Sequence, residues 1–347
     1  MSLLDNRRYV AIKKLFYDRR YEQRELSTLD EIKKRKLCRN IIELKDRYFQ
    51  NIEEQDEKGQ TVKKEYLFIV TDYLAYTVCD LRVQNTFYTN DPTYDSSPNS
   101  PNNYCLESIK QVMHGVFKGL NDLHQLGITH RDIKLSNILI DNNQYPISSV
   151  KICDLGSSKK LLSDPNDEST QSLNYIGTRS FRAPELLVGN RYYNTKIDIW
   201  SAGVVFLKLI LRYLAKKVSL FEAKNTNHLC KIITEQIGEP TQAELNEMLA
   251  TRDIMSSAVK AGQCDDEILK RRFSKLDSLL KKNVPTDMLD LLHQVFQLSP
   301  LRRISAEDAL RHPFFIRQPD QKASVVTKQS MLKNRTTEAT SPCISYQ

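Results

Sequence analysis

The sequence predicts an α+β fold of two lobes, a small β-rich N-terminal lobe and a large helical C-terminal lobe. The chain has 347 residues, of which 40% are apolar, and this is enough for a large core and more than one lobe. Runs rich in β-branched and aromatic residues occur within residues 1–73. Beyond them, long segments such as Leu106–Leu126 and Ile199–Leu214 have the composition and length of helices.

The first predicted strand is Tyr9–Phe16, where β-branched and aromatic residues are frequent. Successive side chains of a strand point to opposite faces, so Ala11 and Lys13 share one face. A helix is predicted over Arg20–Leu37 because leucine and isoleucine recur there at helical spacing. Glu25 lies on this helix, twelve residues after Lys13, and is the candidate partner of the Lys13 ammonium. The alternative is an exposed glutamate on the helix surface.

Two further strands are predicted at Asn40–Leu44 and Tyr66–Thr71, with the charged segment Glu53–Lys64 as the hairpin loop between them. Asp72–Leu74 then leads into the second lobe. Residues 85–104 are rich in Asn, Pro and Ser and lack core-forming periodicity, so we expect an irregular insertion loop there.

The predicted domain boundaries follow from these segments. The tail is rich in Ser, Thr and Lys and has little apolar periodicity, so we expect it to be disordered. The three parts are the N-terminal lobe at 1–73, the C-terminal lobe at 74–315 and the disordered tail at 316–347.

The stretch Thr129–Asn137 carries the strongest chemical signal, and a second carboxylate, Asp154, follows seventeen residues after Asn137. The Asp132 carboxylate can hold a substrate hydroxyl, and Lys134 supplies positive charge. Asn137 and Asp154 supply the hard oxygen ligands that Mg²⁺ prefers. In-line phosphoryl transfer needs positioning, charge neutralisation and a proton acceptor, and these residue types provide all three. The alternative is an ordinary solvated turn, because charged triplets are common.

The stretch resembles the catalytic loop of protein kinases, and Val10–Lys13 and Ala183–Glu185 resemble two further signatures of that family. The resemblance implies a bilobal kinase fold, ATP and Mg²⁺ as cofactors, and catalysis by Asp132 with Lys134. Lys134 further implies transfer to serine or threonine. Lys13, paired with Glu25, would hold the α- and β-phosphates of ATP.

The same resemblance implies where the adenine binds and how the acceptor site is braced. The residues implied for ATP binding are Ala11, Lys13, Asp72, Leu74, Leu139 and Cys153. Thr178 is expected to hydrogen-bond Asp132 and Lys134, and Asp198 is expected to brace the backbone of the catalytic loop. A structural ion pair is expected between Glu185 and Arg303.

Arg182, directly before Ala183-Pro184-Glu185, is typical of the group that contains cyclin-dependent, MAP, glycogen-synthase and Clk-type kinases. Within this CMGC group the chain is most similar to glycogen synthase kinase 3, on the segments Val10–Lys14, Arg24–Leu26, Cys153–Lys159 and Tyr175-Ile176.

The resemblance to glycogen synthase kinase 3 implies a phosphate pocket formed by Arg24, Arg131 and Lys159. Three cations around one point can hold a dianionic phosphate through charge-assisted hydrogen bonds. In the family this pocket receives a phosphate already present on the substrate, so primed phosphoproteins are the expected substrates. The alternative is that the three cations form scattered surface ion pairs. Tyr175 corresponds to the activating phosphotyrosine of the family, or else it is a packed aromatic residue.

The sequence departs from the family at its start. The kinase N-lobe begins with two strands joined by a glycine-rich turn, and these need on the order of 15–20 residues. Only nine residues precede Val10, and none is Gly. We therefore expect the glycine-rich loop to be absent from this chain. A kinase-like binding or scaffold module with impaired catalysis is the alternative function.

Composition narrows the partners and the compartment. The net charge is +8, but no nucleic-acid-binding motif accompanies it, so we expect protein substrates and scaffold proteins rather than nucleic acid. The seven cysteines include no C-x-x-C pair, which argues against a disulfide framework and favours the cytoplasm or nucleus. The first eight residues include Asp5, Arg7 and Arg8, so no signal peptide is expected. The apolar segment Ile199–Leu214 is interrupted by charges and is expected to be a buried helix rather than a membrane span.

Overall fold

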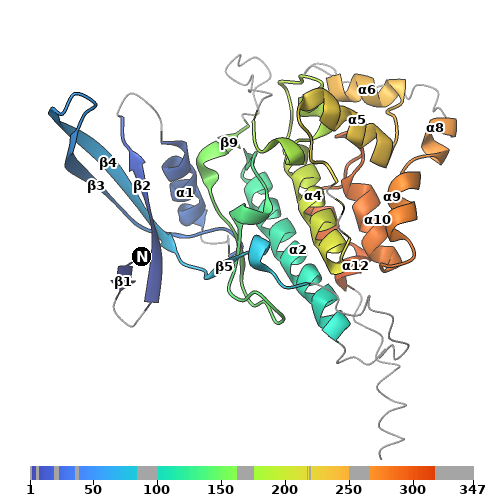
Figure 1. Cartoon of the computed structure of the whole chain (residues 1–347), viewed down its shortest axis with the longest axis horizontal. Coiled ribbons are helices and arrows are strands. Elements are labelled where there is room, and N and C mark those ends of the chain that lie inside the picture. Colours follow the sequence, from blue (N-terminus) through green and yellow to red (C-terminus); the bar gives the residue numbers. More distant parts are fainter. Residues whose placement is uncertain are drawn as a thin grey trace, which may run out of the picture.

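The structure of the protein, a computed structural model, describes residues 2–4, 8–18, 23–35, 39–83, 101–161, 176–216, 218, 220–249 and 266–316. Figure 1 shows a small lobe built on an antiparallel sheet and a larger lobe built mostly of helices, as the sequence predicts. The strands are β1 (Ser2–Leu4), β2 (Arg8–Phe16), β3 (Leu44–Gln55), β4 (Thr61–Asp72), β5 (Tyr76–Thr77), β6 (Ile128–Thr129), β7 (Ile138–Ile140), β8 (Val150–Ile152) and β9 (Lys159–Lys160).

The helices begin with α1 in the small lobe, and the others belong to the large lobe (Figure 1). They are α1 (Arg24–Arg35), α2 (Pro101–Gln125), α3 (Pro184–Leu187), α4 (Lys196–Tyr213), α5 (Thr226–Ile237), α6 (Gln242–Leu249), α8 (Asp266–Lys270), α9 (Ser274–Leu280), α10 (Thr286–Val295), α11 (Ala306–Leu310) and α12 (Pro313–Ile316).

The sheet of the small lobe has the strand order β1-β2-β4-β3, with every neighbouring pair antiparallel. In β2, Lys13 pairs with Ile69 and Ala11 with Thr71 of β4, so the register of this pair fixes where the Lys13 side chain begins. Residues Ser2–Leu4 pair with Arg8–Val10, which gives β2 a neighbour on its other edge. The predicted absence of the glycine-rich loop stays a prediction.

Two predicted boundaries in the small lobe are wrong. The strand predicted at Asn40–Leu44 is mostly an extended connection, and β3 begins only at Leu44. The segment Glu53–Lys64 is not one long loop, because the strands continue through it to a short turn around Gly59. Gly59 has φ of +74°, a conformation that glycine adopts without steric cost.

Helix α2 begins at Pro101, so the last four residues of the predicted insertion 85–104 are helical. Proline is favoured in the first turn of a helix because its missing N–H would have no partner there. The rest of that insertion, from Asn85 to Ser100, and the tail from Arg317 onward lie outside the described residues.

The core of the large lobe surrounds α4, whose residues are nearly all buried, as predicted for Ile199–Leu214. Trp200 is fully buried and packs edge-on against Phe296, with ring centroids 5.0 Å apart. A second apolar cluster joins the lobes, because Leu29, Ile41 and Leu67 of the small lobe pack with Leu123, Ile128 and Leu155. None of the helices in the described ranges is long and apolar enough to cross a membrane.

Candidate active site

Lys13 joins the sheet to α1 and to the start of the segment after β8. Its Nζ atom lies 2.7 Å from a carboxylate oxygen of Glu25 and 2.9 Å from Oδ1 of Asp154. Burial of Leu29 and Ile32 packs α1 against the lobe's core and so presents Glu25, which is itself buried, to Lys13. The predicted Lys13–Glu25 pair is therefore present.

The three charges stabilise one another. Burial alone would lower the pKa of Lys13, but the hydrogen bonds and charges of Glu25 and Asp154 outweigh it and raise that pKa. Burial would likewise raise the pKa of Asp154, but Lys13 lowers it instead. Both groups are therefore charged at neutral pH. Asp154 adopts left-handed backbone angles, φ 62° and ψ 68°, which Asp tolerates better than most residues.

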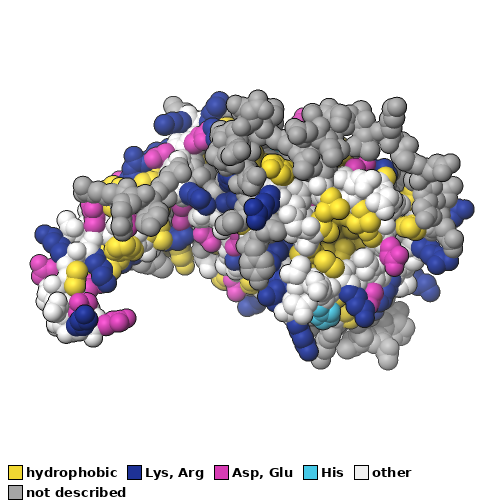
Figure 2. All heavy atoms as spheres, turned by 90° about the horizontal axis from the view of Figure 1, so that it is seen from above, with side chains coloured by type: hydrophobic (Ala, Val, Ile, Leu, Met, Phe, Trp, Pro, Cys, Tyr) yellow, Lys and Arg dark blue, Asp and Glu magenta, His cyan; other side chains and the backbone are white. Residues whose placement is uncertain are grey.

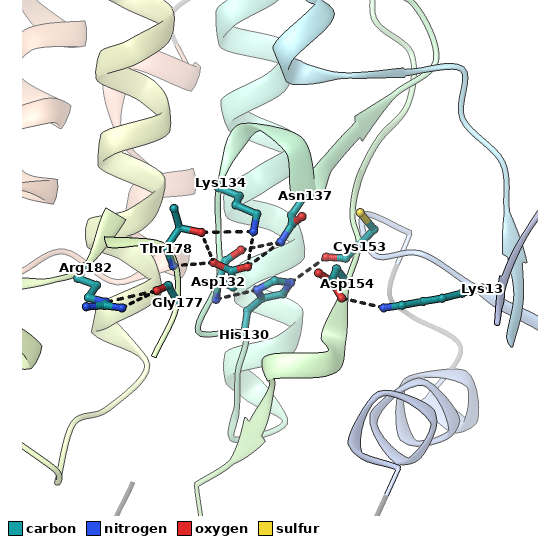
Figure 3. A network of polar contacts seen from close by, with 10 residues as sticks. All are labelled: Lys13, His130, Asp132, Lys134, Asn137, Cys153, Asp154, Gly177, Thr178 and Arg182. Atoms are coloured by element: carbon teal, nitrogen blue, oxygen red, sulfur yellow. Dashed lines mark hydrogen bonds and ion pairs between the residues drawn. The ribbon is translucent and has the colours of Figure 1, made fainter. Parts of the chain in front are cut away.

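Asp132 lies at the centre of a hydrogen-bond cluster (Figure 3). Its Oδ1 accepts hydrogen bonds of 2.9 Å from both the backbone N–H and the hydroxyl of Thr178. Its Oδ2 accepts bonds of 2.6 Å from Lys134 Nζ and 3.2 Å from Asn137 Nδ2. Lys134 also donates to the Thr178 hydroxyl, at 3.3 Å. The predicted contacts of Thr178 with Asp132 and Lys134 are thus confirmed, and the carboxylate has one fixed orientation.

The loop that carries Asp132 is held in place by Asp198, which is fully buried on α4. The Asp198 carboxylate accepts bonds of 2.8 Å from the backbone N–H groups of His130 and Arg131, which confirms the predicted brace. Gly177 approaches the same loop, and a Cβ atom there would come within 2.4 Å of the Arg131 carbonyl oxygen. Only glycine fits at this position, which also has φ of +66°.

The segment around Thr178, residues 176–185, is fixed by two arginines. Arg182 donates to the carbonyls of Ile176 and Gly177, at 2.8 and 2.9 Å. Arg303 makes a two-pronged ion pair with Glu185, with distances of 2.7 and 2.9 Å, and both side chains are buried. This confirms the predicted Glu185–Arg303 pair.

The side chains expected to contact adenine lie at the junction of the lobes. Leu74, Leu139 and Cys153 all pack against the apolar cluster that joins the two lobes. Burial, with a further contribution from the Asp154 charge, raises the pKa of Cys153 to about 12, so this thiol is neutral and behaves as an apolar wall. Ala11 is half-buried on β2.

A family model for the protein kinase domain matches residues 2–315 of the chain. The chain belongs to the protein kinase family. Together with the relatives below, this confirms the predicted family and fold, and identifies a serine/threonine protein kinase of the glycogen synthase kinase 3-like type.

The kinase is similar to several curated relatives. Glycogen synthase kinase 3 of Trypanosoma brucei brucei is 30% identical over 321 residues, which cover 90% of this chain and 78% of the relative. Protein kinase gsk31 of Schizosaccharomyces pombe is 31% identical over 315 residues, covering 90% and 70%. Mitogen-activated protein kinase 5 of Oryza sativa subsp. indica is 34% identical over a shorter match of 214 residues, covering 62% and 52%.

The side chain of Asp72 in the kinase connects the two lobes through ion pairs. Its carboxylate lies 2.9 Å from Lys45 of β3 and 2.6 Å from Lys151 of β8. Only its backbone therefore remains for the predicted role in ATP binding.

Replacing Asp72 by asparagine is expected to change how stability depends on pH. Burial would raise the pKa of Asp72, but Lys151 and Lys45 outweigh it and lower that pKa below its usual value. The carboxylate therefore adds stability above its unfolded pKa of about 3.9, and this is lost as pH falls through the lower folded pKa. Asp72→Asn should cost about 1–3 kcal/mol at neutral pH.

The measurement is the urea midpoint of both proteins at several pH values. The difference in urea midpoint between wild type and Asp72→Asn should become smaller as the pH falls below about 4. The exposed Asp46→Asn serves as the control and should show only a small, constant gap. A gap for Asp72→Asn that does not change with pH would contradict the ion-pair assignment.

The three cations predicted to form a phosphate pocket have different surroundings. Arg131 is buried and donates to the Ser157 carbonyl at 2.5 Å and to the Tyr193 hydroxyl at 3.1 Å. Arg24 is exposed at the first residue of α1, and Lys159 begins β9. Their convergence on one phosphate stays a prediction. Tyr175 lies outside the described residues.

Some site contacts have no sequence signal that could have predicted them. The His130 ring lies 3.0 Å from the Cys153 carbonyl oxygen, and His124 lies 3.0 Å from Asp198. The first contact connects the loop of Asp132 directly to the residue before Asp154 (Figure 3). Such contacts depend on tertiary packing, which residue spacing does not reveal. His130 belongs to the stretch that resembles the kinase catalytic loop, but this resemblance does not indicate which atom its ring contacts.

Proposed function

We propose that this kinase transfers the γ-phosphate of ATP to serine or threonine of protein substrates, with Asp132 as the group that accepts the hydroxyl proton. The observation that carries the proposal is the fixed Asp132 carboxylate, whose two oxygens are held by Thr178, Lys134 and Asn137. Lys134 lies beside this carboxylate and would offset negative charge on the phosphoryl oxygens.

We assign Lys13 to the α- and β-phosphates, oriented by Glu25. The Lys13 side chain is 44% exposed despite its two ion pairs, so the ammonium is accessible from the space between the lobes. Ala11, Leu74, Leu139 and Cys153 would contact the adenine, with the backbone of Asp72–Leu74 reading its edge.

Protein kinases in general use Mg²⁺ with ATP, and Asn137 and Asp154 fit this ion. Asn137 donates through Nδ2 to Asp132, which directs its Oδ1 oxygen elsewhere, and the Asp154 carboxylate is 43% exposed. No group of three or more His, Cys, Asp or Glu side chains gathers into a metal site in the described parts of the chain. Two oxygen ligands from the protein are enough for Mg²⁺, because this ion usually keeps several bound waters and takes its remaining ligands from the phosphates of the substrate. When bound, it neutralises phosphate charge.

We also propose that Arg24, Arg131 and Lys159 favour primed substrates. Arg131 supports this, because its guanidinium is buried and held in one orientation by Ser157 and Tyr193. Three cations near a dianionic phosphate give strong charge-assisted bonds.

The test compares two serine peptides that differ only in a phosphate four residues C-terminal to the acceptor. We expect kcat/KM to be about 10- to 100-fold higher for the primed peptide, since charged hydrogen bonds contribute about 1.5–3 kcal/mol each. Arg24→Ala should reduce this preference, whereas Arg311→Ala, which removes an exposed cation on another surface, should not.

Equal rates for the two peptides would remove the pocket but leave the kinase assignment in place. Nucleotide binding without transfer to either peptide would instead support the alternative function, a kinase-like binding module with impaired catalysis.

A further inference from the structure

Two adjoining cavities of about 780 and 280 Å³ run along one side of α2. They share Asn40, His114 and Ser148, so they form one continuous depression, which we call the α2 groove. The end of α1, the connection 39–44, α2 and the segment 147–151 form its walls. Its larger cavity has an aliphatic floor of well-buried side chains, namely Ile32, Ile42, Leu44 and Val150.

The rim of the groove is positively charged. Its lining includes five cations, Lys33, Arg39, Lys110, Lys118 and Lys151, against two carboxylates, Glu43 and Glu107. The last turn of α1 also carries Lys34 and Arg35, but these line a separate cavity together with Arg47 and Lys160. On the face shown in Figure 2, Lys and Arg side chains lie on both lobes.

Of the five cations that line the groove, three have partners among the described residues, and two are not held by a hydrogen bond or ion pair there. Glu43 pairs with Lys45, and Lys151 pairs with Asp72. Arg39 and Lys118 are exposed, and no hydrogen bond or close ion pair to a described residue holds either side chain, although Lys118 interacts electrostatically with Asp122 one turn along α2. They therefore remain available to an anionic ligand, Arg39 from the connection 39–44 and Lys118 from α2.

The groove lies at the junction of the lobes, away from Asp132. The connection 39–44, one wall of the groove, is bound to β8, the strand that leads to Asp154. The Ile152 N–H donates to the Asn40 carbonyl at 2.9 Å, and the Ile42 N–H donates to the Ile152 carbonyl at 2.8 Å. A ligand in the groove would contact both lobes without covering the catalytic cluster.

We propose that the α2 groove binds an acidic segment of protein substrates, whose carboxylates meet Arg39 and Lys118 while an aliphatic side chain enters the floor. The proposal rests on the kinase function given above. The tail of the chain itself is disfavoured as the occupant, because residues 317–347 carry five Lys or Arg against two Asp or Glu and so have the same sign as the rim. The aliphatic floor of the larger cavity offers no stacking surface for bases, and the two aromatic rings of the lining, His114 and Phe315, pack edge-on against each other, which disfavours nucleic acid.

The test measures binding, so it does not depend on catalysis. The probe is a fluorescein-labelled peptide of glutamates interleaved with leucines, followed by anisotropy with the full chain. We expect the double variant Arg39→Glu with Lys118→Glu to raise the Kd of this peptide at least about tenfold. Binding should also weaken between about 50 and about 300 mM KCl. The matched control reverses two exposed cations elsewhere in the large lobe, Lys281→Glu with Lys282→Glu, and should leave the Kd unchanged.

Two results would overturn the proposal. The first is equal loss of binding in the control variant, which would mean that total charge rather than the groove binds the peptide. The second is tighter binding of a single-stranded RNA with the same dependence on Arg39 and Lys118, which would make the groove a nucleic-acid site. A peptide that binds as expected to a chain without kinase activity would uphold the groove while rejecting the proposed function.

Discussion

Replacing Asp132 by asparagine is expected to lower kcat for peptide phosphorylation by about 10²–10⁴-fold, the usual contribution of a positioned general base. An amide cannot accept the hydroxyl proton. It also presents an NH₂ group to donors, since Lys134 Nζ, Asn137 Nδ2 and the two Thr178 groups all donate to the carboxylate. Nucleotide binding should persist, because Lys13, Glu25 and Asp154 are untouched. The measurement is steady-state phosphorylation of a serine peptide, with nucleotide affinity measured separately.

The matched control for this variant is Asp141→Asn. Asp141 is exposed and accepts only the backbone N–H groups of Ser148 and Ser149 among the described residues. Its replacement should change kcat less than about twofold, as is usual for surface substitutions. If Asp132→Asn retained the wild-type rate, Asp132 would not be the proton acceptor.

Replacing Arg303 by methionine is expected to cost about 3–5 kcal/mol of unfolding free energy, the largest loss of stability that the described contacts predict. The change leaves the Glu185 carboxylate buried without a cation. It also removes donors from the carbonyls of Gln297 and Lys196, which Arg303 bonds at 3.0 and 2.9 Å. Domains are usually stable by only 5–15 kcal/mol, so this one change removes a large share.

Urea denaturation of this variant should be compared with that of Arg311→Met. Arg311 is 67% exposed and pairs with Glu307 and Asp308 on the surface, so its loss should cost about 0–1 kcal/mol. Adding Glu185→Gln to Arg303→Met should recover part of the loss, because no buried charge then remains. A cost for Arg303→Met no greater than that of the surface control would show that the pair adds no stability.

The arrangement of the catalytic cluster could be predicted from the sequence because its residues belong to short motifs with fixed roles. The contacts of Thr178 with Asp132, of Asp198 with the catalytic loop, and of Glu185 with Arg303 are each implied by resemblance, although Glu185 and Arg303 are 118 residues apart in sequence. The contact of Lys13 with Asp154, 141 residues away, is not predicted. Spacing and composition alone predicted the residue types needed for phosphoryl transfer, not these contacts.

The strands of the long hairpin were predicted poorly for a physical reason. Strand β3 is exposed along most of its length after Leu44, so it has no buried face and no alternation of apolar residues for sequence analysis to detect. Its stability comes from backbone pairing with β4 and from aromatic contacts such as the stacked rings of Tyr48 and Phe68, 4.8 Å apart. Cross-strand partners of this kind depend on register, which a single sequence does not reveal.

The connection between α1 and β3 limits how the cleft of the kinase can open. Asn40 and Ile42 are bonded to Ile152 on the large lobe, and the Asn40 side chain donates to the Val150 carbonyl at 2.9 Å. Gly119 of α2 lies so close that a Cβ atom there would come within 2.7 Å of the Asn40 carbonyl oxygen. We therefore expect nucleotide entry and release to proceed by rotation of the small lobe about an axis through Asn40, and not by separation of the lobes.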